Sequence, residues 1–246
     1  MDRRSLLEMF SFGQKAPEAE TGPVGSVRLV PSVRYVMAID VRRCVGCQAC
    51  TVACAMENRT PLGSQRTFVS DFEVLDGDRP RKSPVPRLCN HCKRPPCVRA
   101  CPVQATYQRP DGLVLVDPAR CVGCGYCVLN CPYGARFLNH YAKTADKCSL
   151  CAHRLDAGLL PACVETCIGK ARIMGDANDP DSAVSRLLAE AGPAVRVLKP
   201  EAGTEPMVFY LGLAAGTPVE MPGSEILPLG NPGTPGHVRI TEENFR

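Results

Sequence analysis

The sequence has no tryptophan, and aromatic residues make up only 5% of its 246 residues. A conventional hydrophobic core depends on large apolar side chains, so the chain has little material for one. It also has no apolar stretch that approaches the roughly 20 residues of a transmembrane helix. Proline and glycine are frequent, with 23 and 21 copies, which favours loops over long regular elements. The length allows one large domain or two small ones.

Cysteine is unusually frequent, and its sixteen copies fall into four groups of four. The first and third groups have the spacing Cys-x2-Cys-x2-Cys-x3-Cys, the second has Cys-x2-Cys-x4-Cys-x3-Cys, and the fourth has Cys-x2-Cys-x11-Cys-x3-Cys. In chain order the groups are Cys44, Cys47, Cys50 and Cys54; Cys89, Cys92, Cys97 and Cys101; Cys121, Cys124, Cys127 and Cys131; and Cys148, Cys151, Cys163 and Cys167. Three closely spaced cysteines wrap one iron–sulfur cubane, and in two-cluster ferredoxins the fourth binds the neighbouring cluster. Sixteen thiolates therefore predict four [4Fe–4S] clusters in a protein that carries electrons and has no catalytic residues of its own.

Three other uses of cysteine compete with this interpretation. Structural zinc sites draw on two separated pairs of ligands, whereas these motifs crowd four cysteines into a short stretch. A disulfide framework would need strained local bridges and is typical of much smaller chains. Scattered core thiols do not explain a fourfold repeat. Zinc is the alternative that chemical analysis must exclude.

The net charge does not indicate a nucleic-acid binder. The formal charge is +4, but four clusters with their thiolates add about −8, at about −2 each. The loaded protein is therefore expected to be acidic, and no basic-aromatic motif supports nucleic-acid binding.

The N-terminus begins with Arg3-Arg4, which is similar to the start of a twin-arginine export signal. The apolar region and small-residue cleavage site of such a signal do not follow. We therefore predict an arm over residues 1–32 that docks on a partner, with a frayed chain end as the alternative. Its contact face would be Leu6, Leu7, Met9 and Phe10.

The coarse pattern predicts an α+β protein with short elements. A strand over 33–40 leads into the first motif, and a helix over 51–58 follows it. Two short strands flank Pro110-Asp111-Gly112, which is a hairpin signal. Further predictions are a surface connection over 61–86, a strand over 171–176, a helix over 181–190, and little regular structure from residue 216 onward.

Residues from about 35 to 211 resemble the four-cluster subunits of the complex iron–sulfur molybdoenzyme family, which includes polysulfide, tetrathionate, arsenate and dimethyl sulfoxide reductases. The motifs that carry the resemblance are Cys44-Val-Gly-Cys47-Gln-Ala-Cys50, Cys89-Asn-His-Cys92 with Pro95-Pro96-Cys97, Cys121-Val-Gly-Cys124-Gly-Tyr-Cys127, Cys131-Pro-Tyr-Gly-Ala-Arg136-Phe137, Asp146-Lys-Cys148 and Gly175-Asp-Ala-Asn-Asp-Pro180.

The resemblance implies two nested bacterial-ferredoxin-like modules with an irregular C-terminal extension. The outer half would comprise 33–60 and 141–178, the inner half 61–140, and the extension 179–246. The implied ligand sets are Cys44, Cys47, Cys50 with Cys167; Cys54 with Cys148, Cys151, Cys163; Cys89, Cys92, Cys97 with Cys131; and Cys121, Cys124, Cys127 with Cys101. Some relatives replace a third-motif cysteine and hold a [3Fe–4S] centre, whereas this chain keeps all of them. Cys54 and Cys167 lack the proline that follows Cys101 and Cys131.

The resemblance also implies partners. These are a molybdenum- or tungsten-pterin catalytic subunit and a polytopic membrane subunit that handles quinol. Alternatives are a cytochrome and menaquinone complex without a pterin, including a multihaem cytochrome, or a soluble pterin enzyme such as a transhydroxylase. We expect a peripheral position on the membrane, with the cytoplasmic face favoured and export with a signal-bearing partner as the other option.

Other polar and aromatic residues near the motifs have smaller predicted roles. His91, His140 and His153 are expected to donate hydrogen bonds or face solvent, since sixteen sulfurs already suffice as ligands. Tyr126 and Tyr133 are expected to pack around a cubane. Five basic residues either raise nearby cluster potentials or are ordinary surface charges: Lys93, Arg94, Arg136, Lys143 and Lys147.

Overall fold

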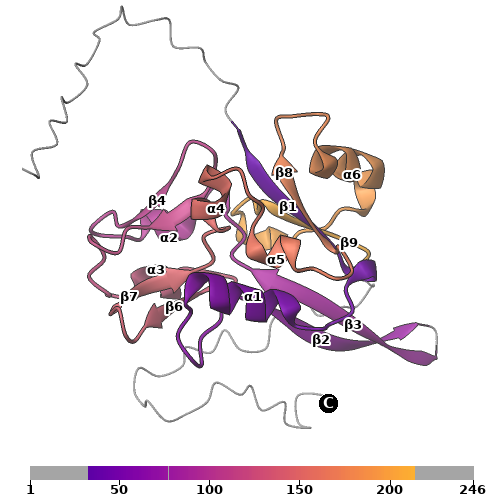
Figure 1. Cartoon of the computed structure of the whole chain (residues 1–246), viewed down its shortest axis with the longest axis horizontal. Coiled ribbons are helices and arrows are strands. Elements are labelled where there is room, and N and C mark those ends of the chain that lie inside the picture. Colours follow the sequence, from indigo (N-terminus) through magenta and orange to yellow (C-terminus); the bar gives the residue numbers. More distant parts are fainter. Residues whose placement is uncertain (1–32, 77, 214–246) are drawn as a thin grey trace, which may run out of the picture. The chain divides into compact units, whose positions relative to one another are not determined.

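The computed structural model describes residues 33–76 and 78–213 (Figure 1). The chain divides into two units, Met1–Val30 and Pro31–Arg246, and the described residues belong to the second. The predicted docking arm and the tail from residue 216 lie outside the described residues. Short helices and small sheets confirm the predicted mixed α and β content. Within the described ranges, no helix has the length and apolar character needed to cross a membrane.

A three-stranded sheet is built around β1 (Tyr35–Asp40), the strand predicted before the first motif. Strand β8 (Arg172–Asp176) pairs with it antiparallel, and β9 (Val208–Leu211) pairs with it parallel. Helix α6 (Ala183–Ala191) begins after Ser182, whose hydroxyl accepts the Ser185 amide as an N-cap. The structure therefore confirms the predicted strands over 33–40 and 171–176 and the helix over 181–190.

The region predicted as a surface connection over 61–86 is instead largely a long hairpin. Strand β2 (Thr67–Asp76) pairs antiparallel with β3 (Arg79–Leu88), and the half of β3 from Ser83 to Leu88 is buried. The prolines of β3 lie at positions 80, 84 and 86. Because all three are an even number of residues apart, their backbone nitrogens lie on the edge of β3 that faces away from β2. The β2–β3 ladder therefore loses no hydrogen-bond donor to proline.

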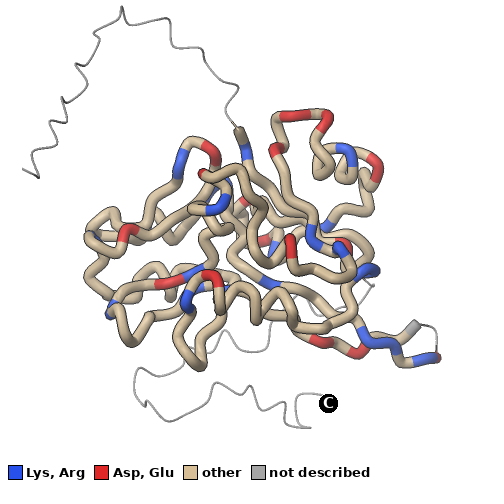
Figure 2. The backbone as a smooth tube through the Cα atoms, in the orientation of Figure 1, with Lys and Arg blue, Asp and Glu red and all other residues tan. Residues whose placement is uncertain are grey.

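The hairpin is tied to the rest of the protein at one end and charged at the other. Tyr210 of β9 donates its hydroxyl hydrogen bond to the Pro86 carbonyl at 2.9 Å. Toward the turn, acidic positions of β2 lie alongside basic positions of β3 (Figure 2). Glu73 pairs opposite Lys82, and Lys82 also forms an ion pair with Asp71 at 3.0 Å. Such opposite charges help to set the register of two strands.

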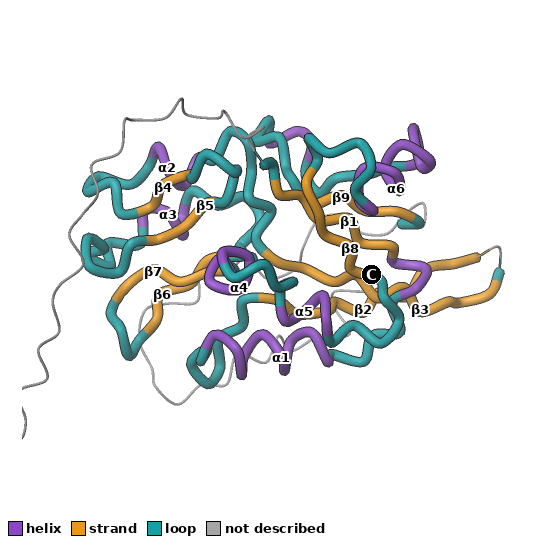
Figure 3. The backbone as a smooth tube through the Cα atoms, turned by 45° about the horizontal axis from the view of Figure 1, so that its top comes forward, coloured by secondary structure: helices purple, strands orange, loops and turns teal. Residues whose placement is uncertain are grey.

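Two smaller hairpins accompany the second and third cysteine motifs. Strands β4 (Thr106–Gln108) and β5 (Val114–Val116) confirm the predicted hairpin around Pro110-Asp111-Gly112. Strands β6 (Arg136–Asn139) and β7 (Thr144–Lys147) form a second one that the sequence pattern did not predict. Figures 1 and 3 both place these four strands together with the short helices α2 (Pro96–Arg99) and α3 (Tyr126–Leu129), on the side of the described region away from α6.

Three further helices lie near the middle and the lower edge of the described region in Figure 3. They are α1 (Ala49–Asn58), α4 (Ala152–Asp156) and α5 (Ala162–Glu165), visible in Figure 3. Helix α1 confirms the helix predicted over 51–58. Short 3-10 helices complete the described elements: η2 (Val41–Arg43), η3 (Gly192–Ala194) and η4 (Pro200–Ala202). Cysteines are part of the buried core, so the apolar residues and the motifs share one interior.

Candidate metal-cluster sites

Each cysteine motif opens with a tight loop that needs a left-handed residue. The residue before the second cysteine has positive φ in all four motifs: Gly46 at 70°, His91 at 40°, Gly123 at 70° and Leu150 at 51°. Glycine adopts this conformation without cost, whereas His91 and Leu150 are held in it by their surroundings. The loop turns the chain back on itself, which brings the first two cysteines of each motif to one side.

The first cavity is lined by cysteines of the second and third motifs. It encloses about 300 Å³ of space outside protein atoms. Its cysteines are Cys89, Cys92, Cys97 and Cys131. Tyr133 and Arg136 also line it, so Tyr133 lies beside these four cysteines, and its packing around a cubane stays a prediction. Four sulfurs around one cavity, with a cation beside them, suit a cofactor that takes four thiolate ligands and carries negative charge.

The second cavity is lined by cysteines of the first and fourth motifs. It encloses about 350 Å³, and its cysteines are Cys44, Cys47, Cys50 and Cys167. Arg172 lines this cavity as Arg136 lines the first. Within the described residues, no group of three or more His, Cys, Asp or Glu side chains is arranged to hold a single metal ion. The cysteines of both cavities surround a larger space.

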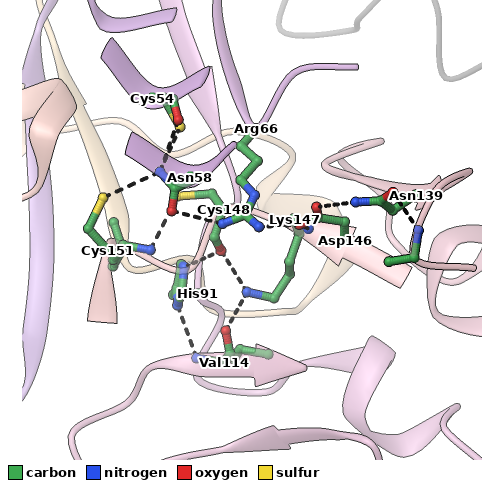
Figure 4. Close-up of polar contacts among 12 residues, drawn as sticks. Cys54, Asn58, Arg66, His91, Val114, Asn139, Asp146, Lys147, Cys148 and Cys151 are labelled. Carbon is green, nitrogen blue, oxygen red and sulfur yellow. Dashed lines mark hydrogen bonds and ion pairs between the residues drawn. The ribbon is translucent and has the colours of Figure 1, made fainter. Parts of the chain in front are cut away.

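A third set of cysteines meets where α1 approaches α5. Asn58 donates to the sulfurs of Cys54 at 3.5 Å and Cys151 at 3.7 Å (Figure 4). Cys54 is also close enough to Cys163 and Cys148 for their charges to interact. Burial, followed by these neighbouring sulfurs, raises the pKa of Cys54 to about 12.

The fourth predicted set joins Cys101 to three cysteines of the third motif. Cys121 and Cys127 share an apolar cluster with Cys97 of the first cavity. The sulfur of Cys101 accepts backbone hydrogen bonds from Ala105 at 3.2 Å and Thr106 at 3.4 Å. Cys124 is exposed, as is the equivalent Cys47 of the first motif. These cysteines therefore have the amide donors and the surface access of a partly open site.

A repeated turn follows the fourth cysteine of the last three motifs. Gln104, Gly134 and Lys170 each have positive φ, and each amide donates to the carbonyl of the cysteine three residues before it. The next residue is an alanine, which is buried in two of the motifs and half-buried in the other. The residue after it begins a strand and is Thr106, Arg136 or Arg172. The repeat Cys-x3-Ala therefore directs a buried polar side chain toward the cysteines.

Two of these strand-initial residues are buried arginines that donate to sulfur. Arg136, which is 4% exposed, donates to Cys97 at 3.1 Å and to Thr106 at 3.2 Å. Arg172, which is 3% exposed, donates to Cys50 at 3.4 Å. Sequence reasoning considered Arg136 but missed Arg172. The signal that marks Arg172 is its position, five residues after Cys167 as Arg136 is after Cys131.

His91 and Lys147 form a fully buried junction between the second and fourth motifs (Figure 4). His91 accepts from the Val114 amide at 3.0 Å, and its other nitrogen lies 3.1 Å from the Cys148 carbonyl. The Lys147 ammonium donates to the carbonyls of Val114 and Cys148. Burial lowers the pKa of Lys147 and drives the pKa of His91 well below its ordinary range. His91 is therefore a neutral hydrogen-bonding residue, which matches the predicted role.

The remaining predicted positions lie at the surface. Lys93 and Arg94 are exposed and form ion pairs with Glu205, and Lys143 is exposed. His153 contacts Glu57 at 2.7 Å, and His140 is an exposed residue beside the Tyr141 ring. Tyr126 is 55% exposed, so it does not pack in an enclosed site. Of the five basic residues considered, only Arg136 and Lys147 are buried next to cysteines.

The chemistry of the buried groups fits an anionic cofactor ligated by thiolates. Burial raises the pKa of Cys92 to about 12, so this thiol needs a bound metal to be deprotonated at neutral pH. Within the described residues, Arg87 and Arg136 each have a buried Nε without a hydrogen-bond partner. Of these two, Arg136 lines the first cavity beside four sulfurs, where a free donor suits a negatively charged iron–sulfur cluster.

The fold and these sites define a cluster-binding electron-transfer protein, and comparison with known proteins identifies its family. A 4Fe-4S dicluster domain family matches residues 82–177. The chain is 60% identical over 185 residues to a tetrathionate reductase subunit of Salmonella typhimurium, covering 74% of each chain. It is 48% identical over 180 residues to a tetrathionate reductase subunit of Archaeoglobus fulgidus, covering 73% of this chain and 83% of the relative. It is 36% identical over 227 residues to an Hdr-like menaquinol oxidoreductase iron–sulfur subunit of the same organism, covering 73% and 84%.

The chain belongs to the family of iron–sulfur electron-transfer subunits of complex iron–sulfur molybdoenzymes. Its cofactors are [4Fe–4S] clusters, and its sixteen cysteines fit four of them. This confirms the predicted cofactor and the family resemblance.

Proposed function

We propose that this chain relays electrons through four [4Fe–4S] clusters between a molybdenum- or tungsten-pterin catalytic subunit and a quinol-handling membrane subunit. The observation that carries the proposal is the pair of cavities, each lined by four cysteines from two motifs and by one buried arginine. Clusters of this type take up and release single electrons at potentials set by hydrogen bonds, charge and exposure. The chain's own contribution is to hold, space and surround them.

We assign the ligands as four crossed sets. Cys89, Cys92, Cys97 and Cys131 bind in the first cavity, and Cys44, Cys47, Cys50 and Cys167 bind in the second. The contacts of Asn58 support the third set, which is Cys54, Cys148, Cys151 and Cys163. The fourth is Cys101, Cys121, Cys124 and Cys127. In each set the fourth cysteine comes from a different motif, as it does in two-cluster ferredoxins.

These crossed sets favour the nested arrangement of two ferredoxin-like modules. An inner half over 61–140 would hold the second and third motifs, and an outer half over 33–60 and 141–178 would hold the first and fourth. Val69 and Pro86 of the β2–β3 hairpin line the second cavity, so this hairpin contributes to the outer site as well. The extension from 179 includes β9, which joins the sheet of β1.

Two sites reach the surface in a way that suits contact with partners. Cys47 is exposed and shares its cavity with Val45, which is 66% exposed, and Cys167 of the same cavity is followed by Ile168, which is 76% exposed. Cys124 is exposed beside Val122, which is also 66% exposed, and Tyr126. Both sites have the sequence Cys-Val-Gly-Cys. Exposed apolar residues next to a redox site are typical of an interface, so we assign these two faces to the two partner subunits.

The names of the relatives suggest the complex. Two of them are tetrathionate reductase subunits, one at 60% identity, so we propose that the catalytic partner reduces tetrathionate. We further propose a peripheral position on the membrane, held by the quinol-handling partner, on the cytoplasmic face or exported with a signal-bearing subunit. The menaquinol oxidoreductase relative supports a second candidate, in which the same chain serves a quinol complex without a pterin subunit.

The test is to purify the chain with its native partners and to measure iron, sulfide, molybdenum, tungsten and haem, with mass spectrometry of the co-purified chains. About sixteen irons per chain with a pterin metal would support the first candidate. The same iron content with haem and no pterin metal would favour the second. Zinc without sulfide would overturn both.

A further inference from the structure

Arg172 contacts cysteines of two different ligand sets. Its Nη2 lies 3.4 Å from the Cys50 sulfur, which lines the second cavity. Its Nη1 lies 3.8 Å from the sulfur of Cys163, which belongs to the third set. The guanidinium group therefore lies between two sites that are otherwise separate, with one nitrogen on each side.

Besides these sulfurs, Arg172 contacts a neutral hydroxyl of the hairpin. Thr67 of β2 accepts from Nη2 at 2.8 Å and itself donates to the Arg87 carbonyl at 2.6 Å. In the described part of the chain, no ion pair joins Arg172 to a carboxylate. An arginine remains protonated in a protein, and a buried charge without a counter-charge is strongly unfavourable. The cysteine sulfurs are the anionic groups within its reach.

We propose that Arg172 sets the reduction potentials of both clusters that flank it, the one ligated by Cys50 and the one ligated by Cys163. This inference rests on the proposed function, because it takes the assigned ligand sets as given. Reduction adds negative charge to a cluster, and a fixed positive charge in a buried, poorly screened place stabilises the reduced form. The hydrogen bonds to sulfur act in the same direction. One side chain thus raises the reduction potentials of two neighbouring clusters.

Arg136 provides an internal control. It occupies the equivalent position after Cys131 and is buried to the same degree. Its sulfur contact is Cys97 of the first cavity, at 3.1 Å, and its second contact is the Thr106 hydroxyl. The two arginines therefore have the same local design but different cysteine partners. Loss of Arg172 and loss of Arg136 should therefore change different cluster signals.

The experiment is a redox titration followed by electron paramagnetic resonance on the full chain purified with its partners. Wild type is compared with Arg172→Met, Arg172→Lys and Arg136→Met, after iron and sulfide are shown to be equal. In Arg172→Met, two of the four signals should shift to more negative potentials. In Arg172→Lys, which keeps the charge, the same two should shift less. In Arg136→Met, the most shifted signal should be one that Arg172→Met leaves in place.

The outcomes separate this inference from the function it rests on. Unchanged potentials in an Arg172→Met protein with full iron content would overturn the role of Arg172 alone, as would an equal shift of all four signals or identical effects of Met and Lys. If Arg172→Met loses iron, the same titration is made with Arg172→Lys and Thr67→Val. The absence of a selective shift in both of these variants would then overturn the inference. A wild-type protein without iron–sulfur clusters would instead overturn the proposed function.

Discussion

His91 donates its Nε2 hydrogen to the carbonyl oxygen of Cys148, 3.1 Å away, and so joins the second cysteine motif to the fourth. The direction of this bond follows from the other ring nitrogen, which accepts the Val114 amide at 3.0 Å and is therefore unprotonated. The ring is fully buried and neutral. One imidazole thus satisfies two buried backbone groups from distant parts of the chain.

Replacing His91 by alanine should strongly lower the stability of the folded protein. The change leaves the buried Val114 amide without a partner, at about 1–3 kcal/mol, and it places alanine at positive φ. The Cys148 carbonyl loses the His91 bond but still accepts from the Lys147 ammonium. His91→Asn is the matched variant, because asparagine tolerates this conformation and keeps a donor and an acceptor. We expect a lower denaturant midpoint for loss of the visible cluster absorbance in His91→Ala and a smaller decrease in His91→Asn. Equal midpoints in wild type and His91→Ala would contradict the role of this junction.

Gly46 and Gly123 have the same sequence context and the same φ of 70°, but alanine should be tolerated differently. Both substitutions strain the backbone by about 1–2 kcal/mol. A Cβ at position 123 would lie 2.4 Å from the backbone oxygen of Lys143, whereas a Cβ at position 46 would lie 3.1 Å from a side-chain oxygen of Asp71. We expect Gly123→Ala to lose far more iron per chain than Gly46→Ala, measured on proteins purified in parallel. The reverse order would show that the approach to Lys143 is not limiting.

Serine substitutions in one motif can test whether the ligand sets cross. Cys131 lines the first cavity with three second-motif cysteines, whereas Cys127 belongs to the proposed set with Cys121 and Cys124. We therefore expect Cys131→Ser and Cys127→Ser to alter two different cluster signals in electron paramagnetic resonance spectra. If each motif held its own cluster, the two variants would alter the same signal.

Removal of iron should abolish the cooperative fold. Cysteines from several sites are part of the main buried core, and Arg136, Lys147 and Arg172 are buried without a carboxylate partner in the described residues. Without clusters these three cations have no strong counter-charge, and metal-dependent domains of this kind fold with their metal. After anaerobic chelation we expect loss of the cooperative unfolding transition in circular dichroism. A chelated protein that still unfolds cooperatively would show that the apolar core suffices.

The sequence predicted those elements whose signals are local. The strand before the first motif, the hairpin around Pro110-Asp111-Gly112 and the helix capped by Ser182 were each recognisable within a short window. The β2–β3 hairpin was missed because prolines and charges suggested a loop, and their even spacing becomes meaningful only when a partner strand is known. Strand β9 was missed because its partner β1 lies far away in the sequence.

The candidate sites divide in the same way. The spacing of the sixteen cysteines was enough to predict their role as ligands and the identity of the cofactor, because the geometry of a cubane requires this spacing. The contacts of His91 with Cys148 and of Arg172 with Cys50 and Cys163 could not be read from the chain, because tertiary packing creates them. A buried arginine is unexpected from composition unless its counter-charge is known, and here that charge belongs to a cofactor.

The two cavities also differ in when they can exist during synthesis of the protein. The cysteines of the first cavity all lie between Cys89 and Cys131, so the ribosome delivers them within one short interval. Those of the second cavity begin at Cys44 but are incomplete until Cys167 has emerged, and the sheet beside them lacks an edge strand until Leu211 follows. The second cavity is thus the last of the two to be available for cluster insertion, and its first three cysteines must remain reduced and unpaired throughout that delay.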